Sequence, residues 1–372
     1  MKNSRIRILH VTHNMDIGGT EQVIRQIVTA CSRMRYESSI LCVDGTIGQI
    51  GRSMQSDGFS VVSISRGSGF DRRAVAALRS YIRDNEIDVL HCHQYTPFCY
   101  GAFAALLLGI KVIFTEHGRF HPDRFSWKRR LVNQLVHRLA DNITCISNAT
   151  RLALDHYEWI PKKRIQVIYN GVATLEQDAE DKSIRRKLGI PDTALVLGTI
   201  SRFDPIKNQL MMLNALCEVR KTNPDCVLIM AGDGPERKSL ESKAQELNIH
   251  NSVYFTGFIT DIAAHLNAID IFLLTSFSEG TSMTLLEAMS VGKVVIATAV
   301  GGNVEVVTDG ISGILIPSDD TDALVDNLNR LKKSPLEMHR LSRGAMQAYS
   351  ERFSVNIMAN QYEELYKGKN RS

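Results

Sequence analysis

Short apolar runs alternate with helical patterns along the whole chain, in two series separated by a polar segment. The runs are rich in β-branched residues and Leu, and many are apolar on both faces, as in parallel strands covered by helices. In the first series they cover residues 6–12, 39–43, 61–64, 89–93, 112–115, 143–146 and 165–168. In the second they cover 194–200, 227–231, 253–255, 271–274, 294–298 and 313–316. This predicts two doubly wound α/β domains facing each other across a cleft, with ligands at the carboxyl ends of the strands.

Helical spacing fills the segments between these runs, including residues 74–83 and 128–140. In the second of these segments every fourth residue is apolar, which predicts a stripe packed on its own domain: Trp127, Leu131, Leu135 and Leu139. Residues 171–191 are acidic and polar and predict a linker with a short helix. Residues 353–366 predict a last amphipathic helix. We therefore expect an N-terminal domain over 1–172, a second domain over 173–350 and a C-terminal helix within 351–372 that packs back toward the first domain.

The composition is that of an ordinary globular protein, but its charge is unevenly divided. Charged residues make up 23% and hydrophobic residues 44% of the 372 residues, which excludes a disordered, collagen-like or coiled-coil chain. Residues 1–170 hold 23 Lys+Arg and 14 Asp+Glu, a net charge of +9, whereas residues 171–372 hold 21 and 26, a net charge of −5. A basic half could meet an anionic substrate, a membrane surface or nucleic acid, or its charges could simply be scattered over the surface.

The cysteines and the apolar stretches indicate a cytoplasmic protein. The seven cysteines show no repeated close spacing, which is typical of buried, reduced thiols. The charged start of the chain does not resemble a secretory signal. The longest apolar stretch, residues 100–110, is shorter than the roughly 20 residues that a membrane-spanning helix needs.

Two places in the first half could carry chemistry. Gly18 and Gly19 follow the first strand and open a helix, where backbone N–H groups can approach a phosphate or simply form a tight turn. His117 follows the strand at 112–115, where it could hydrogen-bond a substrate hydroxyl, shuttle a proton or cap its own loop. His91 and His93 lie on one face of a strand, but no further ligand is visible at metal spacing, so no metal site is expected.

The second half carries a stronger set of charged residues. Arg202 and Lys207 lie in a strand-to-helix loop and suit a diphosphate, although exposed charges of this kind are commonly only solvated. Glu279 and Glu287 are eight residues apart, the first in a loop and the second in the following helix. Between them, Gly280 to Ser282 offer backbone N–H groups at a helix N-terminus. One carboxylate could hold sugar hydroxyls and the other a ribose; alternatively, they are a helix-end charge and a surface acid.

Taken together, these motifs resemble the retaining glycosyltransferases of family four, which have the GT-B fold and act on nucleotide sugars. The resemblance runs almost end to end. It rests on the order and spacing of Gly18-Gly19-Thr20-Glu21, the His117 loop, Asn170-Gly171-Val172, Arg202 with Lys207, Gly232-Asp233-Gly234-Pro235, Gly257-Phe258, Glu279 with Glu287, and the C-terminal helix. It implies two Rossmann-like domains, the first for the acceptor and the second for the nucleotide sugar.

The resemblance also implies roles for individual residues. Arg202 and Lys207 would neutralise the donor diphosphate in place of a metal ion, so that neither a metal nor another cofactor is expected. Glu279 would hold the transferred sugar, Glu287 the ribose, and His117 would face the sugar and acceptor. The remaining substrate-binding residues would contact the diphosphate or the base through their backbone or position: Gly18, Gly19, Gly257, Phe258, Gly280, Ser282, Met283 and Thr284. The implied enzyme is a metal-independent hexosyltransferase of bacterial cell-surface polysaccharide or glycolipid biosynthesis, acting on a glycan or lipid-linked acceptor.

Three alternatives concern partners and class. The basic stretch 124–138, with Trp127, could touch an anionic membrane, which would make the protein cytoplasmic but peripheral at the inner face. A nucleotide-sugar epimerase of similar shape would need no acceptor. A non-enzymatic module for membrane or nucleic acid would need a concentrated basic face with exposed aromatic residues. We expect no nucleic-acid partner.

Overall fold

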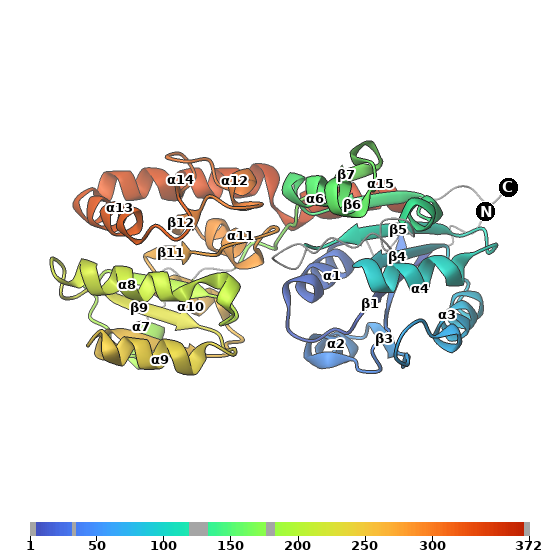
Figure 1. Cartoon of the computed structure of the whole chain (residues 1–372), viewed down its shortest axis with the longest axis horizontal. Helices are drawn as coiled ribbons and strands as arrows, with labels where there is room; N and C mark the ends of the chain where they lie inside the picture. The colour runs from blue at the N-terminus through green and yellow to red at the C-terminus, as the bar shows by residue number, and fades with distance from the viewer. Residues whose placement is uncertain (1–4, 32–34, 119–132, 176–182, 368–372) are drawn as a thin grey trace. The chain divides into compact units, whose positions relative to one another are not determined.

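The computed structural model describes residues 5–31, 35–118, 133–175 and 183–367. The chain forms two units (Figure 1): unit 1 comprises Met1–Gly171 with Val355–Ser372, and unit 2 comprises Val172–Ser354. Each apolar run that the sequence predicts to be a strand is a strand, with small shifts at the ends. The predicted alternation of strands and helices is therefore confirmed in both halves of the chain.

Unit 1 is built on a parallel sheet of seven strands in the order β3-β2-β1-β4-β5-β6-β7. Parallel strands in the middle of such a sheet are covered on both faces, so their residues are apolar whichever way they point. The strands are β1 (Ile6–Thr12), β2 (Tyr36–Cys42), β3 (Ser60–Ser63), β4 (Val89–His93), β5 (Lys111–Glu116), β6 (Asn142–Cys145) and β7 (Ile165–Val167).

Helices cover both faces of this sheet (Figure 1). The helices α1 (Gly19–Ala30) and α2 (Gly48–Ser56) enclose one core with β2, whereas α3 (Arg72–Asp84) and α4 (Tyr95–Ala105) enclose the other with β1, β4 and β5. The helix α6 (Asn148–Glu158) adds to the second core. The last helix, α15 (Val355–Tyr366), packs on α1 and buries Tyr362 and Tyr366 completely. The final helix therefore belongs to unit 1, although it follows unit 2 in the chain.

Unit 2 repeats the architecture with a six-stranded parallel sheet in the order β10-β9-β8-β11-β12-β13. Its strands are β8 (Val196–Ile200), β9 (Val227–Ala231), β10 (Val253–Gly257), β11 (Ile271–Leu274), β12 (Val294–Thr298) and β13 (Ile314–Ile316). One core lies beneath α8 (Gln209–Arg220), α9 (Arg237–Glu246) and α13 (Thr321–Lys333). The other helices are α7 (Ser183–Lys187), α10 (Ile262–Ala268), α11 (Met283–Ser290), α12 (Asn303–Val306) and α14 (Pro335–Arg352).

Each sheet has one point where the strand order reverses. In unit 1 it lies between β1 and β4, and in unit 2 between β8 and β11. The loops that leave two such strands run to opposite faces of the sheet and leave a crevice at their carboxyl ends, where ligands of doubly wound folds bind. The segments after β8 and β11 contain Lys207 and Glu279, and those after β1 and β5 contain Gly18, Gly19 and His117.

The expectation for the helix at 128–140 is wrong in one respect. Trp127 and Leu131 lie outside the described residues, but Leu135 is 69% exposed and does not pack on the unit. The buried residues that the structure describes on this segment are Asn133, Val136, His137 and Ala140, so the buried side is offset from the predicted stripe, although Leu139 is partly buried and packs against the core of unit 1. None of the described helices combines the length and apolar character that a membrane crossing needs.

Candidate functional site

The loops after β8 and β11 are held together by hydrogen bonds at the switch point of unit 2. The Phe277 N–H donates to the Ile206 carbonyl oxygen at 2.8 Å. The Thr275 hydroxyl donates to the Asn208 carbonyl oxygen at 2.9 Å. These bonds fix the short 3-10 turn from which Lys207 projects.

An ion pair between these loops is the centre of the candidate site. Lys207 Nζ donates to Glu279 Oε1 at 2.6 Å, and the Ser276 hydroxyl donates to the same oxygen at 2.6 Å. The Glu279 side chain is 8% exposed and that of Lys207 is 24% exposed. An ammonium group has three N–H donors, of which this bond uses one. The pair therefore presents a cation for an anionic ligand beside a carboxylate for hydroxyl groups.

The loop after β12 fixes Glu279 from behind. Gly302 N–H donates to the Glu279 carbonyl oxygen at 3.0 Å. Gly301 has a φ of +49°, and a Cβ atom there would lie 2.0 Å from the same oxygen. Only glycine fits such an approach. Gly301 was not among the residues predicted for the site, although a Gly-Gly pair shortly after the predicted strand 294–298 was a signal for it.

Glu287 is not the surface acid of the alternative interpretation. It lies in α11, its side chain is buried, and its Oε2 atom has no hydrogen-bond partner among the described residues. Burial raises the pKa of this carboxyl to about 7, because desolvation disfavours the charged form. A buried, unpartnered carboxyl oxygen is costly unless a ligand supplies the missing hydrogen bond.

The N-terminus of α11 is capped by its own chain. The Ser282 hydroxyl accepts from the Leu285 N–H at 3.3 Å, so this hydroxyl serves the helix. Gly280 precedes the cap, and Met283 and Thr284 form the first turn, where N–H groups point out of the helix. The predicted phosphate-binding backbone therefore lies at a helix N-terminus, as expected, and its binding role stays a prediction.

Arg202 lies in the loop after β8 and its side chain is 72% exposed. The Gly-Asp-Gly-Pro motif supports this loop. A Cβ on Gly232 would lie 2.0 Å from the Ser201 oxygen, and one on Gly234 would lie 2.3 Å from the Phe203 oxygen. The glycines of this motif thus let two backbone segments touch, which positions the Arg202 loop.

Gly257 and Phe258, which are predicted to lie near the nucleotide base, lie at the end of β10, the strand next to the one that precedes the Gly-Asp-Gly-Pro motif. The Gly257 carbonyl oxygen accepts from the Gly232 N–H at 2.8 Å. Gly257 has a φ of +71°, and Phe258, which follows it, is 52% exposed. An exposed aromatic ring at the end of β10 is available for stacking.

In unit 1, Gly18 and Gly19 lie at the start of α1, and the carboxylate of Glu21 lies beside Gly18. Gly18 is the N-cap, and a Cβ there would lie 2.3 Å from Glu21 Oε2. A Cβ on Gly19 would meet nothing within 4 Å. Burial raises the pKa of Glu21. At this helix end the space next to Gly19 is therefore open to a ligand, whereas the Glu21 side chain occupies the space next to Gly18.

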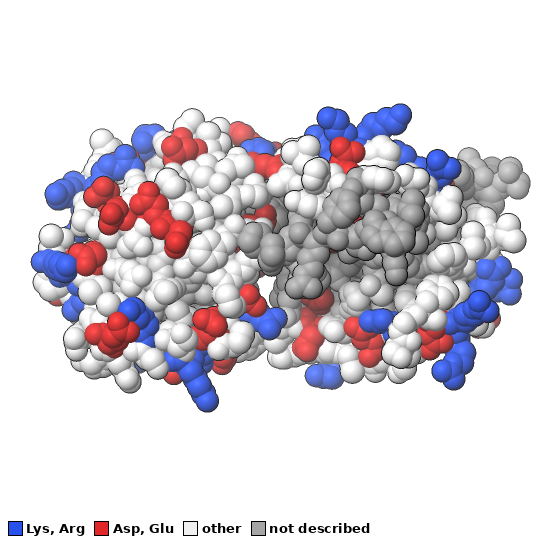
Figure 2. Space-filling view, in the orientation of Figure 1, with Lys and Arg blue, Asp and Glu red and all other residues white. Residues whose placement is uncertain are grey.

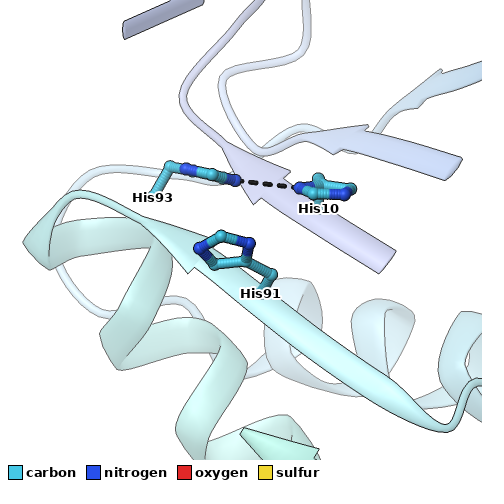
Figure 3. A group of neighbouring side chains, drawn as sticks. All are labelled: His10, His91 and His93. Carbon is cyan, nitrogen blue, oxygen red and sulfur yellow. Dashed lines mark hydrogen bonds between the residues drawn. The ribbon is translucent and has the colours of Figure 1, made fainter. Parts of the chain in front are cut away.

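His117, which is partly buried, lies beside three buried histidines, of which only His91 and His93 were singled out from the sequence. His91 and His93 point to one face of β4, as predicted, and His10 on the neighbouring β1 joins them (Figure 3). His93 Nε2 lies 3.0 Å from His10 Nδ1, and His93 Nδ1 lies 2.8 Å from His117 Nε2. No third ligand was visible near this pair in the sequence, because His10 comes close to it only through the pairing of β1 with β4.

Burial keeps these four rings neutral. It lowers the pKa of His10 and of His117 to about 3, and the pKa values of His91 and His93 fall well below the ordinary range. Ring nitrogens of His10, His91 and His93 lie within 4.8 Å of one another, close enough to consider a metal ion. However, His10 and His93 are bonded to each other, and both nitrogens of His91 are engaged by Tyr366 and Thr115.

Known proteins share both the sequence patterns and the fold. A family model described as Glycosyltransferase Family 4 matches residues 17–175, and one described as Glycosyl transferases group 1 matches residues 180–348. The N-acetyl-alpha-D-glucosaminyl L-malate synthase of Bacillus anthracis is 28% identical over 306 residues, covering 80% of this chain and 79% of that protein. An Escherichia coli protein named UDP-Gal:alpha-D-GlcNAc-diphosphoundecaprenol alpha-1,3-galactosyltransferase is 26% identical over 380 residues, covering 98% and 97%.

A solved structure agrees with the fold of the whole chain. The crystal structure of HepE from Anabaena in complex with UDP-glucose superposes with a TM-score of 0.84 at 23% identity, covering 97% of this chain and 99% of that one. The two family models match successive halves of the chain. The protein therefore belongs to the family-four glycosyltransferases and is a nucleotide-sugar-dependent transferase with the GT-B fold.

Proposed function

We propose that this protein is a retaining hexosyltransferase that needs no metal ion and moves a sugar from a UDP-sugar to a glycan or lipid-linked acceptor. The observation that carries the proposal is the Lys207–Glu279 pair at the switch point of unit 2. The names of the Escherichia coli relative and of the HepE complex, which mention UDP-Gal and UDP-glucose, support the choice of base. We further propose a place in bacterial cell-surface polysaccharide or glycolipid synthesis.

The charges in unit 2 suit the departure of a nucleoside diphosphate. Lys207 has two N–H donors beyond the one that binds Glu279. It can therefore bind a phosphate oxygen without releasing the carboxylate. Arg202 is exposed and can fork onto two further oxygens. Together the two cations would stabilise the negative charge that develops on the leaving group, which is the task of a divalent ion in many other phosphate-binding enzymes.

The two carboxylates would divide the hydroxyl groups of the donor between them. Glu279 is held on one side by Lys207 and Ser276, so it would accept hydrogen bonds from the transferred sugar as a fixed group. Glu287 is buried with one unpartnered oxygen. Two ribose hydroxyls would supply the hydrogen bonds that its ionised form lacks. Gly257 and Phe258 would then lie along the base.

In unit 1 we assign Gly19 to backbone contact with the diphosphate and His117 to contact with the sugar and acceptor. The acceptor named for the Escherichia coli relative is linked to diphosphoundecaprenol, which supports a lipid-linked acceptor and work at a membrane surface. Most of the basic stretch at 124–138 lies outside the described residues. On the face shown in Figure 2, basic and acidic side chains are interspersed, which does not favour a module with one concentrated basic face.

A transfer assay tests this proposal. The full chain is incubated with UDP-, GDP- and ADP-sugars, each with a bacterial lipid extract or short oligosaccharides, and products are identified by mass and anomeric configuration. We expect one hexose added to an acceptor, from a UDP-sugar, with its α configuration kept. Conversion of the donor sugar without an acceptor would instead indicate an epimerase. No reaction with any donor, together with binding to vesicles or nucleic acid, would contradict the assignment as a transferase.

A further inference from the structure

Three histidines of unit 1 form one hydrogen-bonded chain that ends at the predicted substrate-facing residue. His10 Nδ1 is bonded to His93 Nε2 at 3.0 Å, and His93 Nδ1 is bonded to His117 Nε2 at 2.8 Å. Figure 3 shows the first of these bonds, between strands β1 and β4. The two outer nitrogens, His10 Nε2 and His117 Nδ1, are buried and have no partner among the described residues.

Neutral imidazoles permit only two proton arrangements in such a chain. Each ring carries one N–H, and each of the two bonds needs one donor and one acceptor. In the first arrangement all three rings carry the proton on Nδ1, so that His117 Nδ1 is a donor and His10 Nε2 is a lone pair. In the second all three carry it on Nε2, so that His10 Nε2–H is the unpaired donor and His117 Nδ1 is an acceptor. The two ends are therefore coupled.

The surroundings of the two ends decide between these arrangements. His10 is fully buried on the inner strand β1, which lies between β2 and β4, so an N–H on its Nε2 could reach neither solvent nor a ligand. A buried N–H without an acceptor is rarer and more costly than an unpaired acceptor. His117 follows β5 directly at the edge of the sheet and is partly exposed as a residue, although its Nδ1 atom is covered, so this end of the series lies nearer to a ligand or water than His10 does.

We propose that His10 and His93 are positioning residues that hold the proton of His117 on Nδ1, so that His117 offers its ligand a hydrogen-bond donor. The identity of that ligand rests on the proposed function, but the proton arrangement does not. His117 then binds a sugar oxygen, a hydroxyl oxygen or a carboxylate, and does not remove a proton from the acceptor through Nδ1. Specificity at this position follows, because a group that can only donate leaves Nδ1–H unpaired.

His91 provides an internal contrast. It lies in the same cluster, with its ring centroid 4.1 Å from that of His93, but it is not one of the three histidines that are hydrogen-bonded in series. The buried Tyr366 hydroxyl lies 2.8 Å from His91 Nδ1, and His91 Nε2 lies 2.7 Å from the Thr115 hydroxyl. Among the described residues the buried Tyr366 hydroxyl has no other acceptor than His91 Nδ1, so Tyr366 donates and His91 carries its proton on Nε2. The cluster is thus expected to contain both tautomers.

Nitrogen NMR on the ligand-free full chain tests the proposal without any substrate. The protein is labelled with ¹⁵N-histidine, and protonated and unprotonated ring nitrogens are distinguished by chemical shift and by coupling to the ring protons. The signals are assigned by the loss of one set in each histidine variant. We expect His10, His93 and His117 as Nδ1–H tautomers and His91 as the Nε2–H tautomer. Failure to find glycosyl transfer would leave this result unaffected.

Matched variants separate positioning from packing. His93→Leu removes the donor to His117 Nε2 and should shift the His117 proton away from Nδ1. His93→Asn places an amide N–H near the former Nδ1 position and should keep it there. His91→Gln alters the same cluster but none of the three histidines that are hydrogen-bonded in series, so it should leave the His117 proton on Nδ1. Should His93→Leu fail to fold, the wild-type tautomers and His93→Asn still decide.

Two results would overturn the proposal. One is a His117 Nε2–H or doubly protonated ring in the wild-type protein near neutral pH. The other is one tightly bound metal ion per purified chain, measured by elemental analysis, whose removal changes the signals of His10, His91 and His93. The second result would make the cluster a metal site in place of a hydrogen-bonded chain.

Discussion

Glu287→Gln should change the free energy of unfolding of the ligand-free protein, relative to wild type, more favourably at high pH than at low pH. The pKa of the Glu287 carboxyl is raised to about 7 by burial, against 4.5 for the exposed group. Between these values the folded state binds more protons than the unfolded state, so this carboxyl lowers the free energy of unfolding as the pH rises. Its full favourable contribution is present below pH 4.5 and is lost by the time the pH has passed 7. A glutamine cannot ionise and removes this dependence.

The magnitude follows from the size of the shift. The interval from 4.5 to about 7 corresponds to roughly 3 kcal/mol, because one unit of pKa is worth about 1.4 kcal/mol. We therefore expect the stability difference, variant minus wild type, to rise by about that amount between pH 4.5 and pH 8. Urea unfolding followed by circular dichroism measures it. Because unit 1 is identical in both proteins, its contribution cancels in the difference.

An exposed acid provides the control. Glu218→Gln changes a carboxylate on α8 whose side chain is 48% exposed, so it removes no desolvated acid and should not show the rise of about 3 kcal/mol. A stability difference for Glu287→Gln that does not change with pH would refute the argument from burial.

If the ribose assignment holds, Glu287→Gln should also bind UDP about 10- to 100-fold more weakly, since a hydrogen bond to a charged group contributes about 1.5–3 kcal/mol. Unchanged UDP affinity would reject the ribose role alone.

Three further results are expected. Lys207→Ala should reduce kcat/KM for the nucleotide sugar by about 100-fold or more without unfolding the protein. Lys221→Ala, which removes an exposed lysine, should leave kcat/KM unchanged. Near-wild-type turnover by Lys207→Ala would exclude the diphosphate role. Transfer should be fully retained in excess chelator, and a loss that added Mg²⁺ or Mn²⁺ restores would contradict a metal-free mechanism. Gly301→Ala should cost about 1–3 kcal/mol of stability and reduce transfer, because its Cβ would meet the Glu279 oxygen. Gly310→Ala, also at positive φ but with no atom within 4 Å, should affect stability less and transfer not at all.

The strands and the loops of the site were predictable because they depend on local pattern. Apolar runs buried on both faces mark parallel strands, and the loop that follows such a strand lies at the ligand-binding edge. This reasoning placed Lys207 and Glu279 at the carboxyl ends of strands in the same unit. It did not show that they form an ion pair, because that contact joins residues 72 apart and requires β8 to lie beside β11.

Contacts that depend on strand order or on exact helix phase could not be predicted. His10 joins His91 and His93 only because β1 pairs with β4. A spacing of four residues placed Leu135 in a buried stripe, but the buried side of this segment is that of Asn133, Val136 and Ala140. The burial of Glu287 likewise depends on how α11 packs in unit 2, which an alternation of apolar and polar residues does not specify.

The most direct test of the central claim is hydrogen–deuterium exchange of the full chain with saturating UDP in the presence of chelator. We predict slowed exchange of backbone amides in residues 201–208 and 279–287, the two segments that contain the Lys207–Glu279 pair and the first turns of α11. The same segments should be unaffected by NAD. Protection by NAD alone around residues 13–21, or no protection in unit 2 by UDP, GDP or ADP, would contradict the account of this site.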